Sequence, residues 1–587
     1  MPTLEWIGKD KVINHHQEVP FRVLERRYSY DEAGQHEEDN SSENMIIRGD
    51  NLEALKALLP RYEGRVKCIY IDPPYNTGNE GWVYNDNVND PRIKKWLGEV
   101  VGKEGEDLTR HDKWLCMMYP RLKLLQKLLA EDGVIFISID DNELYNLKEI
   151  CDEIFGPGCF VSNISWQRTY SKRNDSKGIP AEVEHILVYS KKIQWNPKRL
   201  QRTTEMDEGY SSQDGDEHEW SSVTINAPGA ATHQGMVYAI QHPITGKLLY
   251  PPQGRCWSFG QPQMLQCMNE WTDYELRPVD DYEKRCEICG SDRGVAKEIN
   301  AIMLKKPFVE AQKEALSRYE QGVRKERPWP LLYFTARGKG GLRRKQYLNK
   351  SAGKVATNLW PHIEVGHTGE AANEISLIFN NHSMFDTPKP TRLIEHILQI
   401  SSDSNTIILD SFAGSGTTAH AVLNMNKADG GHRKFILVEM MDYADSITAE
   451  RVKRVIQGYG EGKKAVEGTG GSFSFYDLGE PLLIGENLNE YVGAEKIREY
   501  IWFMETKSPY APVGGENPYY LGSSNDTGYY FYYAPGQVTV LDYQFLSTLT
   551  EKNGSTVIYA DRCSIGADKL AQLGIVFKKI PRDISKL

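Results

Sequence analysis

A carboxylate, two prolines and an aromatic ring follow one another at Asp72-Pro73-Pro74-Tyr75, directly after the apolar run 69–71. A strand cannot continue through the prolines, because neither has an amide hydrogen to donate to a sheet. The chain must therefore leave the sheet at Asp72, with an acid, bare backbone carbonyl groups and a ring at the carboxyl end of a strand. Open α/β sheets bind their ligands at that end. The alternative is a proline turn with a surface tyrosine.

A glycine-rich turn is the second candidate site, and it spans residues 410–416 (DSFAGSG) after the apolar run 406–409. Glycines let a ligand approach the backbone closely at the start of a helix. The next apolar run ends in Glu439, about twenty residues after the turn, where nucleoside-binding α/β folds hold a ribose diol. The turn lacks the full G-x-G-x-x-G of a dinucleotide site and the lysine of a P-loop. It therefore favours an adenosine ligand without a pyrophosphate, and S-adenosylmethionine is the obvious candidate.

Apolar runs that alternate with helical periods must hold both motifs in place. The runs 66–71, 134–139 and 435–438 are mostly apolar, and the segment 114–130 keeps a helical period. Uninterrupted apolar strands that alternate with helices indicate a parallel sheet covered on both faces, so the predicted fold class is α/β. Asp50 lies where another short strand gives way to a helix. Its carboxylate either caps that helix or projects into a crevice toward a donor group.

Composition places the chain among ordinary soluble globular proteins. At 587 residues it is too long for one core and should divide into about three to five domains or subdomains. It has no apolar run of about 18 residues, so we expect no membrane partner. Nine scattered cysteines indicate a reducing cytosol, and hence a cytoplasmic protein. The net charge of −11 argues against a chain that coats nucleic acid all over, but it does not exclude a local basic groove.

The segment from about 195 to 360 contains a strongly basic run in which Glu326 is the only acid. Aromatic residues interleave with this run at Trp329, Tyr333, Phe334 and Tyr347. A basic and aromatic surface suits phosphate neutralisation together with base stacking, whereas a solvated charged face is the alternative. The predicted DNA-binding residues are Arg324, Lys325, Arg327, Arg337, Lys339, Arg343, Arg344 and Lys345.

Cys286 and Cys289 form a lone C-x-x-C motif. A structural zinc ion needs four ligands, and no second C-x-x-C follows. Cys256 and Cys267 could complete a site, although nothing in their spacing demands it. No metal is assigned, and the zinc alternative stays open.

Together, the motif at 72–75 (DPPY) and the D-x-F-x-G-x-G pattern at 410–416 resemble the two signature motifs of amino-group DNA methyltransferases. The catalytic motif precedes the cofactor motif, and a large insert separates them. This order is similar to the circularly permuted β group, in which the insert is the target recognition domain. Within that group the chain is most similar to the modification (Mod) subunits of type III restriction–modification systems. The segments that carry this likeness are 49–55, 70–78, 138–143, 385–390 and 449–451.

The resemblance implies that Asp72 and the carbonyl group of Pro73 accept hydrogen bonds from the exocyclic amine of adenine. That amine is a poor nucleophile because its lone pair is delocalised into the ring, and the two acceptors pull it toward a tetrahedral geometry. Pro73 and Pro74 keep the acceptors oriented. Tyr75 stacks on a base that has been extruded from the duplex. An aspartate at the first position favours adenine, since cytosine amino-methylating relatives usually carry serine there.

For the cofactor, the resemblance implies that the backbone of the glycine turn holds the methionine part and that Glu439 binds the ribose hydroxyls. Asp50 would accept from the adenine amine of the cofactor, with Asn51 beside it. Lys389 is a candidate for the cofactor carboxylate, with a surface residue before a helix as the alternative. The cofactor-binding residues expected in the turn itself are Asp410, Phe412, Ala413, Gly414 and Gly416.

The resemblance also implies how the chain is divided. The expected fold is a Rossmann-like, S-adenosylmethionine-dependent methyltransferase sheet, circularly permuted, with an inserted target recognition domain and a small C-terminal α/β domain. The expected parts are an N-terminal arm and linker (1–43), the catalytic half (44–195), the target recognition domain (196–355), the cofactor-binding half (356–475) and the C-terminal domain (476–587).

The function expected from this resemblance is site-specific methylation of the N6 amine of adenine in double-stranded DNA, with base flipping. We expect a homodimer, with a restriction or helicase subunit as a further partner. The alternatives are methylation of the N4 amine of cytosine, a catalytically silent DNA reader, and methylation of RNA or of a protein glutamine. The intact elbow at 72–75 argues against a silent reader, and the basic and aromatic insert counts against RNA or protein substrates.

Overall fold

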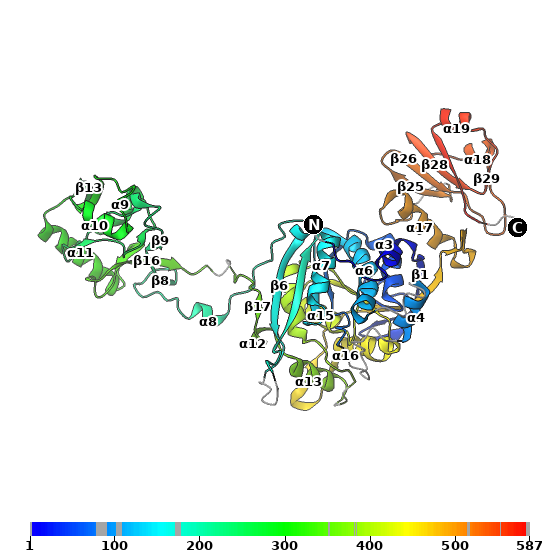
Figure 1. The fold of residues 1–587 in the computed structure, drawn as a ribbon, viewed down its shortest axis with the longest axis horizontal. Coiled ribbons are helices and arrows are strands. Elements are labelled where there is room, and N and C mark those ends of the chain that lie inside the picture. Colours follow the sequence, from blue (N-terminus) through cyan, green and yellow to red (C-terminus); the bar gives the residue numbers. More distant parts are fainter. Residues whose placement is uncertain are drawn as a thin grey trace. The chain divides into compact units, whose positions relative to one another are not determined.

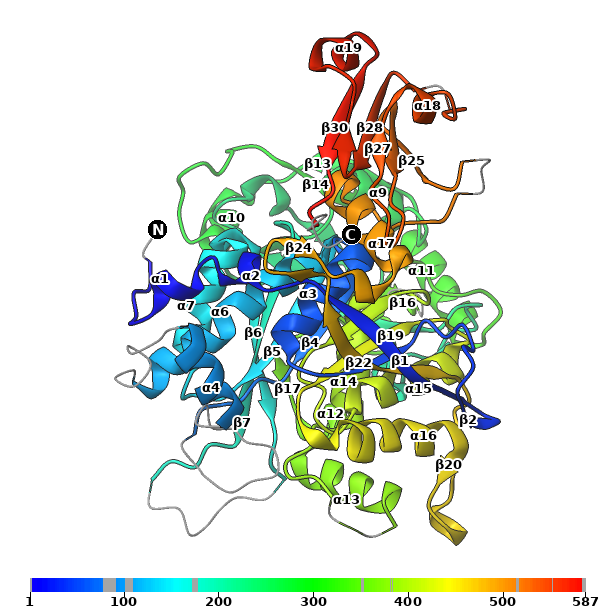
Figure 2. The same cartoon turned by 90° about the vertical axis from the view of Figure 1, so that its right-hand side faces the viewer.

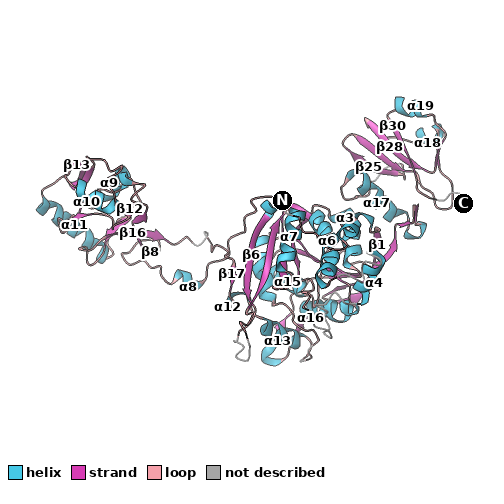
Figure 3. Cartoon of the chain, in the orientation of Figure 1, coloured by secondary structure: helices cyan, strands magenta, loops and turns pink. Residues whose placement is uncertain are grey.

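The computed structural model of the chain divides into two compact units. Unit 1 combines Met1–Lys198 with Ala356–Leu587, and unit 2 is Arg199–Val355. Figure 1 follows the chain through both units by colour, and Figure 3 marks their helices and strands. The residues that the structure describes are 3–77, 91–100, 109–170, 178–349, 353–380, 382, 384–513, 517–551 and 553–582.

Within these residues, unit 1 is built on an eleven-stranded sheet with the order β17-β6-β7-β5-β4-β18-β19-β3-β22-β1-β2. Six adjacent strands, from β5 to β22, are parallel, whereas β7 and β1 run antiparallel to their neighbours. This mostly parallel sheet confirms the predicted α/β fold class. The strands are β1 Arg22–Asp31, β2 Gly34–His36, β3 Met45–Arg48, β4 Val66–Ile71, β5 Leu129–Ile139, β6 Phe160–Gln167, β7 Val183–Ser190, β17 Leu359–Trp360, β18 Ile407–Asp410, β19 Lys434–Glu439 and β22 Phe473–Pro481.

Helices cover both faces of the sheet, because its central strands are apolar on both sides (Figure 2). On one face α3, α6 and α7 share a hydrophobic core with Ile69 and Ile71 of β4. Cys68 and Tyr70 point to the opposite face, where Ser401 at the end of α14 contacts Cys68. The helices of unit 1 around the sheet are α3 Asn51–Tyr62, α4 Pro91–Val100, α6 Arg110–Leu128, α7 Leu144–Phe155, α12 His362–Val365, α13 Thr368–Ile378, α14 Thr391–Ser401, α15 Thr417–Asp429 and α16 Glu450–Gln457.

The first forty residues differ from the arm that the sequence predicts. The strand β1 pairs antiparallel with β22 and so belongs to the main sheet. Two short helices, α1 (Lys9–Val12) and α2 (His15–Glu18), precede it, and Trp6 and Val12 are buried in the core of unit 1. The acidic segment after residue 31 has few apolar side chains to bury, whereas the residues before it do contribute apolar side chains to the core. The main sheet also continues past residue 475, the predicted end of the cofactor-binding half, because β22 extends to Pro481.

A second, smaller sheet follows β22 at the C-terminal end of unit 1, with the order β25-β26-β28-β30. Helix α17 packs between this region and α3. Of the helices in the described ranges, none is both long and apolar enough to cross a membrane. A two-stranded sheet of β20 Gly458–Tyr459 and β21 Val466–Glu467 precedes β22 in the chain. The elements after β22 are β23 Leu483–Ile484, β24 Asn487–Leu488, α17 Ala494–Thr506, β25 Tyr520–Ser524, β26 Thr527–Phe531, β27 Val540–Leu541, α18 Tyr543–Leu546, β28 Ser555–Ala560, β29 Arg562–Cys563, α19 Ala567–Gln572 and β30 Ile575–Lys579.

Unit 2 consists of short strands and helices around an aromatic core. Its core includes Trp220, Tyr238, Trp271 and Phe334, all of them buried. The strands are β8 Trp220–Thr224, β9 Asn226–Pro228, β10 Ile240–Gln241, β11 Leu248–Leu249, β12 Arg255–Trp257, β13 Tyr274–Pro278, β14 Asn300–Leu304, β15 Leu332–Phe334 and β16 Leu342–Tyr347. The helices are α8 Thr204–Asp207, α9 Gln261–Met268, α10 Tyr282–Cys289 and α11 Phe308–Val323.

A buried ion pair lies inside unit 2, between strand β16 and the segment before β8. The ammonium group of Lys345 is 2.6 Å from Asp214 and 2.8 Å from Asp216. Asp214 also accepts hydrogen bonds from the indole of Trp220 and from the backbone of Trp329. The side chains of Lys345 and Asp214 are fully buried. Removing one partner of such a pair leaves an uncompensated buried charge, which costs about 3–5 kcal/mol.

We therefore predict that Lys345→Met destabilises unit 2, because Asp214 loses its cation. Hydrogen exchange followed by mass spectrometry on the full chain measures this directly. Peptides from 199–349 should exchange faster in the variant, while peptides from the main sheet of unit 1 should be unchanged. Lys339→Met is the matched control, because Lys339 is exposed and surface substitutions usually change stability by less than about 0.5 kcal/mol. Equal exchange in both variants would contradict the structural role of Lys345.

Candidate active site

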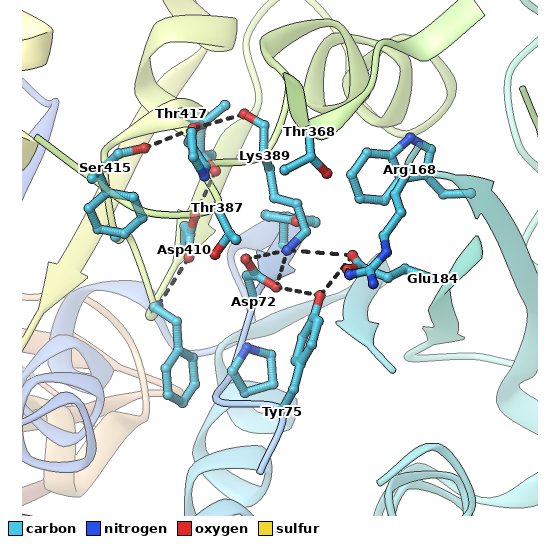
Figure 4. Close-up of a pocket in the computed structure, with 18 of the residues that line it drawn as sticks. Asp72, Tyr75, Arg168, Glu184, Thr368, Thr387, Lys389, Asp410, Ser415 and Thr417 are labelled. Carbon is cyan, nitrogen blue, oxygen red and sulfur yellow. Dashed lines mark hydrogen bonds and ion pairs between the residues drawn. The ribbon is translucent and has the colours of Figure 1, made fainter. Parts of the chain in front are cut away.

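The DPPY elbow leaves the sheet at the carboxyl end of β4. Trp114 of α6 fixes it, because its indole donates a hydrogen bond of 2.6 Å to the carbonyl group of Pro74. Asp72, Pro73 and Tyr75 line a cavity of about 400 Å³, which Figure 4 shows from one side. The elbow therefore presents its acid and its ring to a cavity at this edge of the sheet.

The glycine turn lines the same cavity from the neighbouring strand. β18 pairs in parallel with β4, so Asp410 and Asp72 lie at the same edge of the sheet. The Asp410 carboxylate accepts from the backbone of Phe412 and from the hydroxyl group of Thr418, at 3.0 Å and 2.6 Å. Burial raises the pKa of Asp410 to about 7. These contacts fold the chain back at the start of α15 and leave the backbone of Phe412 and Gly414 along the cavity wall.

Gly416 stands at the N-cap of α15 with a φ of +82°, a conformation that L side chains rarely adopt. A Cβ atom there would lie 3.0 Å from the carbonyl oxygen of Thr448. The hydroxyl group of Thr448 in turn donates to the carbonyl group of Gly414 at 2.6 Å. The segment before α16 therefore supports the turn from behind, and the position requires glycine.

Glu439 lies at the end of β19, behind the glycine turn. Its carboxylate accepts from the backbone of Gly414 at 2.8 Å and from that of Met441 at 3.0 Å. Burial raises the pKa of Glu439 to about 7. The carboxylate is thus held beside the turn, although it is not among the residues that line the cavity.

Asp50 and Asn51 stand beside the same turn at the start of α3. The Asp50 carboxylate accepts from the backbone of Leu52 and Glu53, so the N-cap alternative is present in the structure. Arg121 lies 3.2 Å from the same carboxylate. The buried amide of Asn51 donates to the carbonyl group of Ser411 at 3.2 Å and so ties α3 to the glycine turn. Neither residue lines the cavity.

Four charged or polar side chains form a network around Asp72 (Figure 4). The ammonium group of Lys389 is 2.7 Å and 2.6 Å from the two carboxylate oxygens of Asp72. The hydroxyl group of Tyr75 is 2.8 Å from Asp72 and 3.2 Å from Glu184, which also pairs with Arg168 at 2.6 Å. Burial raises the pKa of the Asp72 carboxyl group, and the ammonium of Lys389 opposes that rise. Burial likewise raises the pKa of Tyr75 far above its usual value.

The structure brings most of the predicted site residues into one cavity. Lys389 lies on Asp72 in this structure, so its ammonium group is already engaged by the catalytic motif. Pro74 and Gly416 support the cavity from outside its lining. The predicted residues that line it are Asp72, Pro73, Tyr75, Lys389, Asp410, Phe412, Ala413 and Gly414.

Several lining residues escaped the sequence analysis. Glu184 offered a signal, because an acid within the apolar strand 183–190 is seldom buried without a partner. Arg168 lies just beyond β6, and no pattern in the sequence connects it to Glu184. Other lining residues of this kind include Trp166, Thr169, Thr368, Thr417 and Thr418.

The basic run of unit 2 divides into exposed and buried members. Arg324, Lys325, Arg327, Arg337 and Lys339 are exposed, and Arg343 and Arg344 are partly exposed on β16. The prediction for Lys345 is wrong, because its ammonium group is buried between Asp214 and Asp216.

The aromatic residues of the run mostly form core rather than a stacking surface. Trp329 stacks on Tyr319 and Tyr333, with ring centroids 5.1 Å and 5.5 Å apart, and Phe334 is 1% exposed. These rings fill the interior of unit 2, so the predicted base stacking by Tyr333 and Phe334 is wrong. Tyr347 keeps 41% of its surface exposed, and its hydroxyl group bonds to Asp216 at 3.0 Å.

The cysteines of unit 2 lie in an apolar cluster. Cys256 and Cys289 are buried there with Ile288, and Cys286 packs against the cluster. Among the residues that the structure describes, no group of three or more His, Cys, Asp or Glu side chains is arranged to hold a metal ion. The zinc alternative therefore gains no support.

Two curated proteins are similar to the chain over most of its length. The Mod subunit of the type III restriction–modification enzyme StyLTI of Salmonella typhimurium is 32% identical over 479 residues, which are 77% of this chain and 62% of the relative. The type II methyltransferase M.KpnI of Klebsiella pneumoniae is 29% identical over 412 residues, 68% of this chain and 81% of the relative. The chain thus spans less than two thirds of the StyLTI Mod subunit.

Among solved structures, PvuII DNA methyltransferase (cytosine-N4-specific) is 11% identical and covers 70% of this chain and 86% of its own, with a TM-score of 0.31. A family model described as DNA methylase matches residues 66–501, which contain both motifs and the insert between them. The likeness to Mod subunits that the motifs indicated is confirmed by the StyLTI relative. From the match over 66–501, the chain belongs to the DNA methylase family.

Proposed function

We propose that the chain transfers a methyl group from S-adenosylmethionine to the N6 amine of adenine at specific sites in double-stranded DNA. The observation that carries this proposal is the shared cavity, in which the DPPY elbow of β4 faces the glycine turn of β18. An amine acceptor and a cradle for an adenosine ligand thus lie at the carboxyl ends of two adjacent parallel strands. Membership of the DNA methylase family supports the same reaction class.

The residues of the glycine turn fit the cofactor. A turn with Gly414 and Gly416 at positive φ leaves its backbone open to a ligand at the start of α15. In our proposal Phe412, Ala413 and Gly414 hold the methionine part, Glu439 the ribose, and Asp50 with Asn51 the adenine. When bound, the cofactor supplies an electrophilic methyl group on a sulfonium.

Asp72 and the carbonyl group of Pro73 act on the target amine by accepting its two hydrogens in hydrogen bonds. This draws the lone pair of the nitrogen out of conjugation and directs it toward the methyl group. The prolines hold both acceptors still, and Trp114 secures the elbow through Pro74. The ring of Tyr75 stacks on the extruded base, and its hydroxyl contacts with Asp72 and Glu184 fix the orientation of the ring.

Unit 2 is proposed as the target recognition domain. Its exposed basic residues suit contacts with phosphates, whereas Lys345 is excluded from this set. We further propose that the chain forms a homodimer, that it acts with a restriction or helicase partner, and that it is located in the cytoplasm. The Mod subunit relatives support the partner, since they are named as parts of type III restriction–modification enzymes.

The first test incubates the full chain with unmethylated duplex DNA and labelled S-adenosylmethionine, and then separates the nucleosides. We expect the label in N6-methyl-2′-deoxyadenosine. Asp72→Ala should lower transfer by about 10²–10³-fold or more, as losses of transition-state hydrogen bonds do, while cofactor affinity stays the same. Asp141→Ala removes an exposed carboxylate of the same unit and serves as the control. Label in N4-methylcytosine would overturn the base assignment, and no transfer by the folded wild-type chain would favour a DNA reader.

The glycine turn gives a second test. Gly416→Ala should weaken cofactor binding by about tenfold or more, because the added Cβ lies 3.0 Å from the Thr448 carbonyl oxygen and shifts the turn. Gly430→Ala is the matched control. Gly430 also has a positive φ, at the other end of α15, but an added Cβ would have no atom within 4 Å. In both variants the left-handed conformation costs about 1–2 kcal/mol. Equal cofactor affinity of the Gly416→Ala and Gly430→Ala variants, measured by calorimetry, would contradict the proposed cofactor site at the glycine turn.

The basic surface gives a third test, on the salt dependence of DNA binding. Replacing Arg343 and Arg344 with alanine should reduce the slope of log K against log salt by about 0.9 for each phosphate that the variant no longer neutralises. The control replaces Arg277 and Lys284, which are exposed in the same unit but outside the basic run. The same slope in the first variant as in the wild-type chain would contradict the predicted phosphate contacts.

A further inference from the structure

Lys389 occupies the position on Asp72 that a target amine needs. Its ammonium group lies within hydrogen-bond distance of both carboxylate oxygens, and the hydroxyl group of Tyr75 takes a third bond. A carboxylate offers about four acceptor positions in all. At least three of these positions are taken, so an amine that bonds to Asp72 must share the carboxylate with Lys389 or displace it.

The same ammonium group also stands where a base would stack. It lies over the ring of Tyr75, 4.9 Å from the ring centroid. A base that packs on this face of Tyr75 and bonds to Asp72 would overlap the Lys389 side chain. Both positions that the proposed reaction assigns to the base are thus held by one side chain.

Lys389 on Asp72 would also oppose the reaction electrostatically. The bound cofactor would carry a positive charge on its sulfonium, and a second cation beside Asp72 would repel that charge. Like charges in a protein site repel each other more strongly than they do in water. The Lys389 side chain is only 10% exposed, so solvent screens little of that repulsion. Removing the cation from Asp72 therefore favours the transition state.

Glu184 is the nearby carboxylate that can receive this cation. Its Oε2 lies 3.8 Å from the ammonium nitrogen of Lys389, so a shift of about 1 Å brings the two into hydrogen-bond distance. The Glu184 side chain is 7% exposed, and Arg168 holds its other oxygen at 2.6 Å. A cation that moves from Asp72 to Glu184 stays paired throughout, which avoids the cost of an isolated buried charge.

We propose that Lys389 is a displaceable plug on Asp72, and that Glu184 is the positioning residue that takes it when the target amine arrives. This inference rests on the proposed methyl transfer. The ammonium group moves from Asp72 to Glu184, two carboxylates that both contact the Tyr75 hydroxyl group, and no proton changes hands. The site is closed by its own lysine, and an amine that competes well for Asp72 opens it.

The test is a suppression experiment on the full chain, with single-turnover methyl transfer measured at saturating cofactor and DNA. Glu184→Gln keeps the size and polarity of the side chain but removes the receiving charge. It should lower the rate about tenfold or more while cofactor affinity stays unchanged. Adding Lys389→Met to that variant should restore the rate to at least the level of Lys389→Met alone, because without the Lys389 ammonium group there is no cation for residue 184 to accept. Glu182→Gln, two residues away and outside the cavity lining, is the matched control.

Three outcomes would overturn the plug. A double variant that shows the product of the two single losses would give Glu184 a role independent of Lys389. A tenfold loss of cofactor affinity in Lys389→Met would assign Lys389 to the cofactor instead. A transfer rate in Glu184→Gln equal to that of the Glu182→Gln control would mean that Glu184 does not accept the Lys389 ammonium group. A wild-type chain that transfers no methyl group contradicts the proposed function itself, and the plug falls with it.

Discussion

The candidate site depends on the parallel pairing of β4 with β18. Cys68 pairs with Ile408 and Ile69 with Leu409, and these residues are almost entirely buried. Parallel strands end at the same edge of a sheet, so this short ladder places Asp72 beside Asp410 although the insert separates them in sequence. The order of the two motifs along the chain then has no effect on the geometry of the cavity. A circular permutation leaves the site intact because the sheet, rather than the connection, brings its halves together.

Three adjacent strands of this edge end at carboxylates, of which Asp410 and Glu439 are buried and Asp72 is partly exposed. Each carboxylate is satisfied differently. Asp410 accepts from a backbone amide and a hydroxyl group, and Glu439 accepts from two backbone amides. Asp72 is held by Lys389 and by Tyr75. Burial raises the pKa of all three. The first two carboxylates shape the glycine turn through bonds to its backbone and to Thr418. Asp72 is instead bonded by Lys389 and Tyr75, side chains that can move, which suits an acceptor whose partner must change.

The sequence predicted the fold class and both motifs because these are local patterns: apolar runs with fixed periods, a proline elbow and a glycine turn. It could not predict the pairing of Arg168 with Glu184, which depends on how β6 lies beside β7 in the sheet. It wrongly predicted DNA binding for Lys345 and base stacking for Phe334, because the sequence does not show whether a basic or aromatic side chain faces solvent or is buried in a core. The prediction of an arm for the first forty residues was wrong because only the pairing of β1 with β22 shows that this segment belongs to the main sheet.

A crystal structure of the chain with sinefungin, which carries an amine in place of the transferable methyl group, would show whether an amine acceptor and a cofactor cradle meet in one cavity. We expect the analogue to bind along Phe412–Gly414 with that amine directed at the Asp72 carboxylate. Sinefungin bound elsewhere in the chain, or in the turn with its amine directed away from Asp72, would contradict a shared cavity.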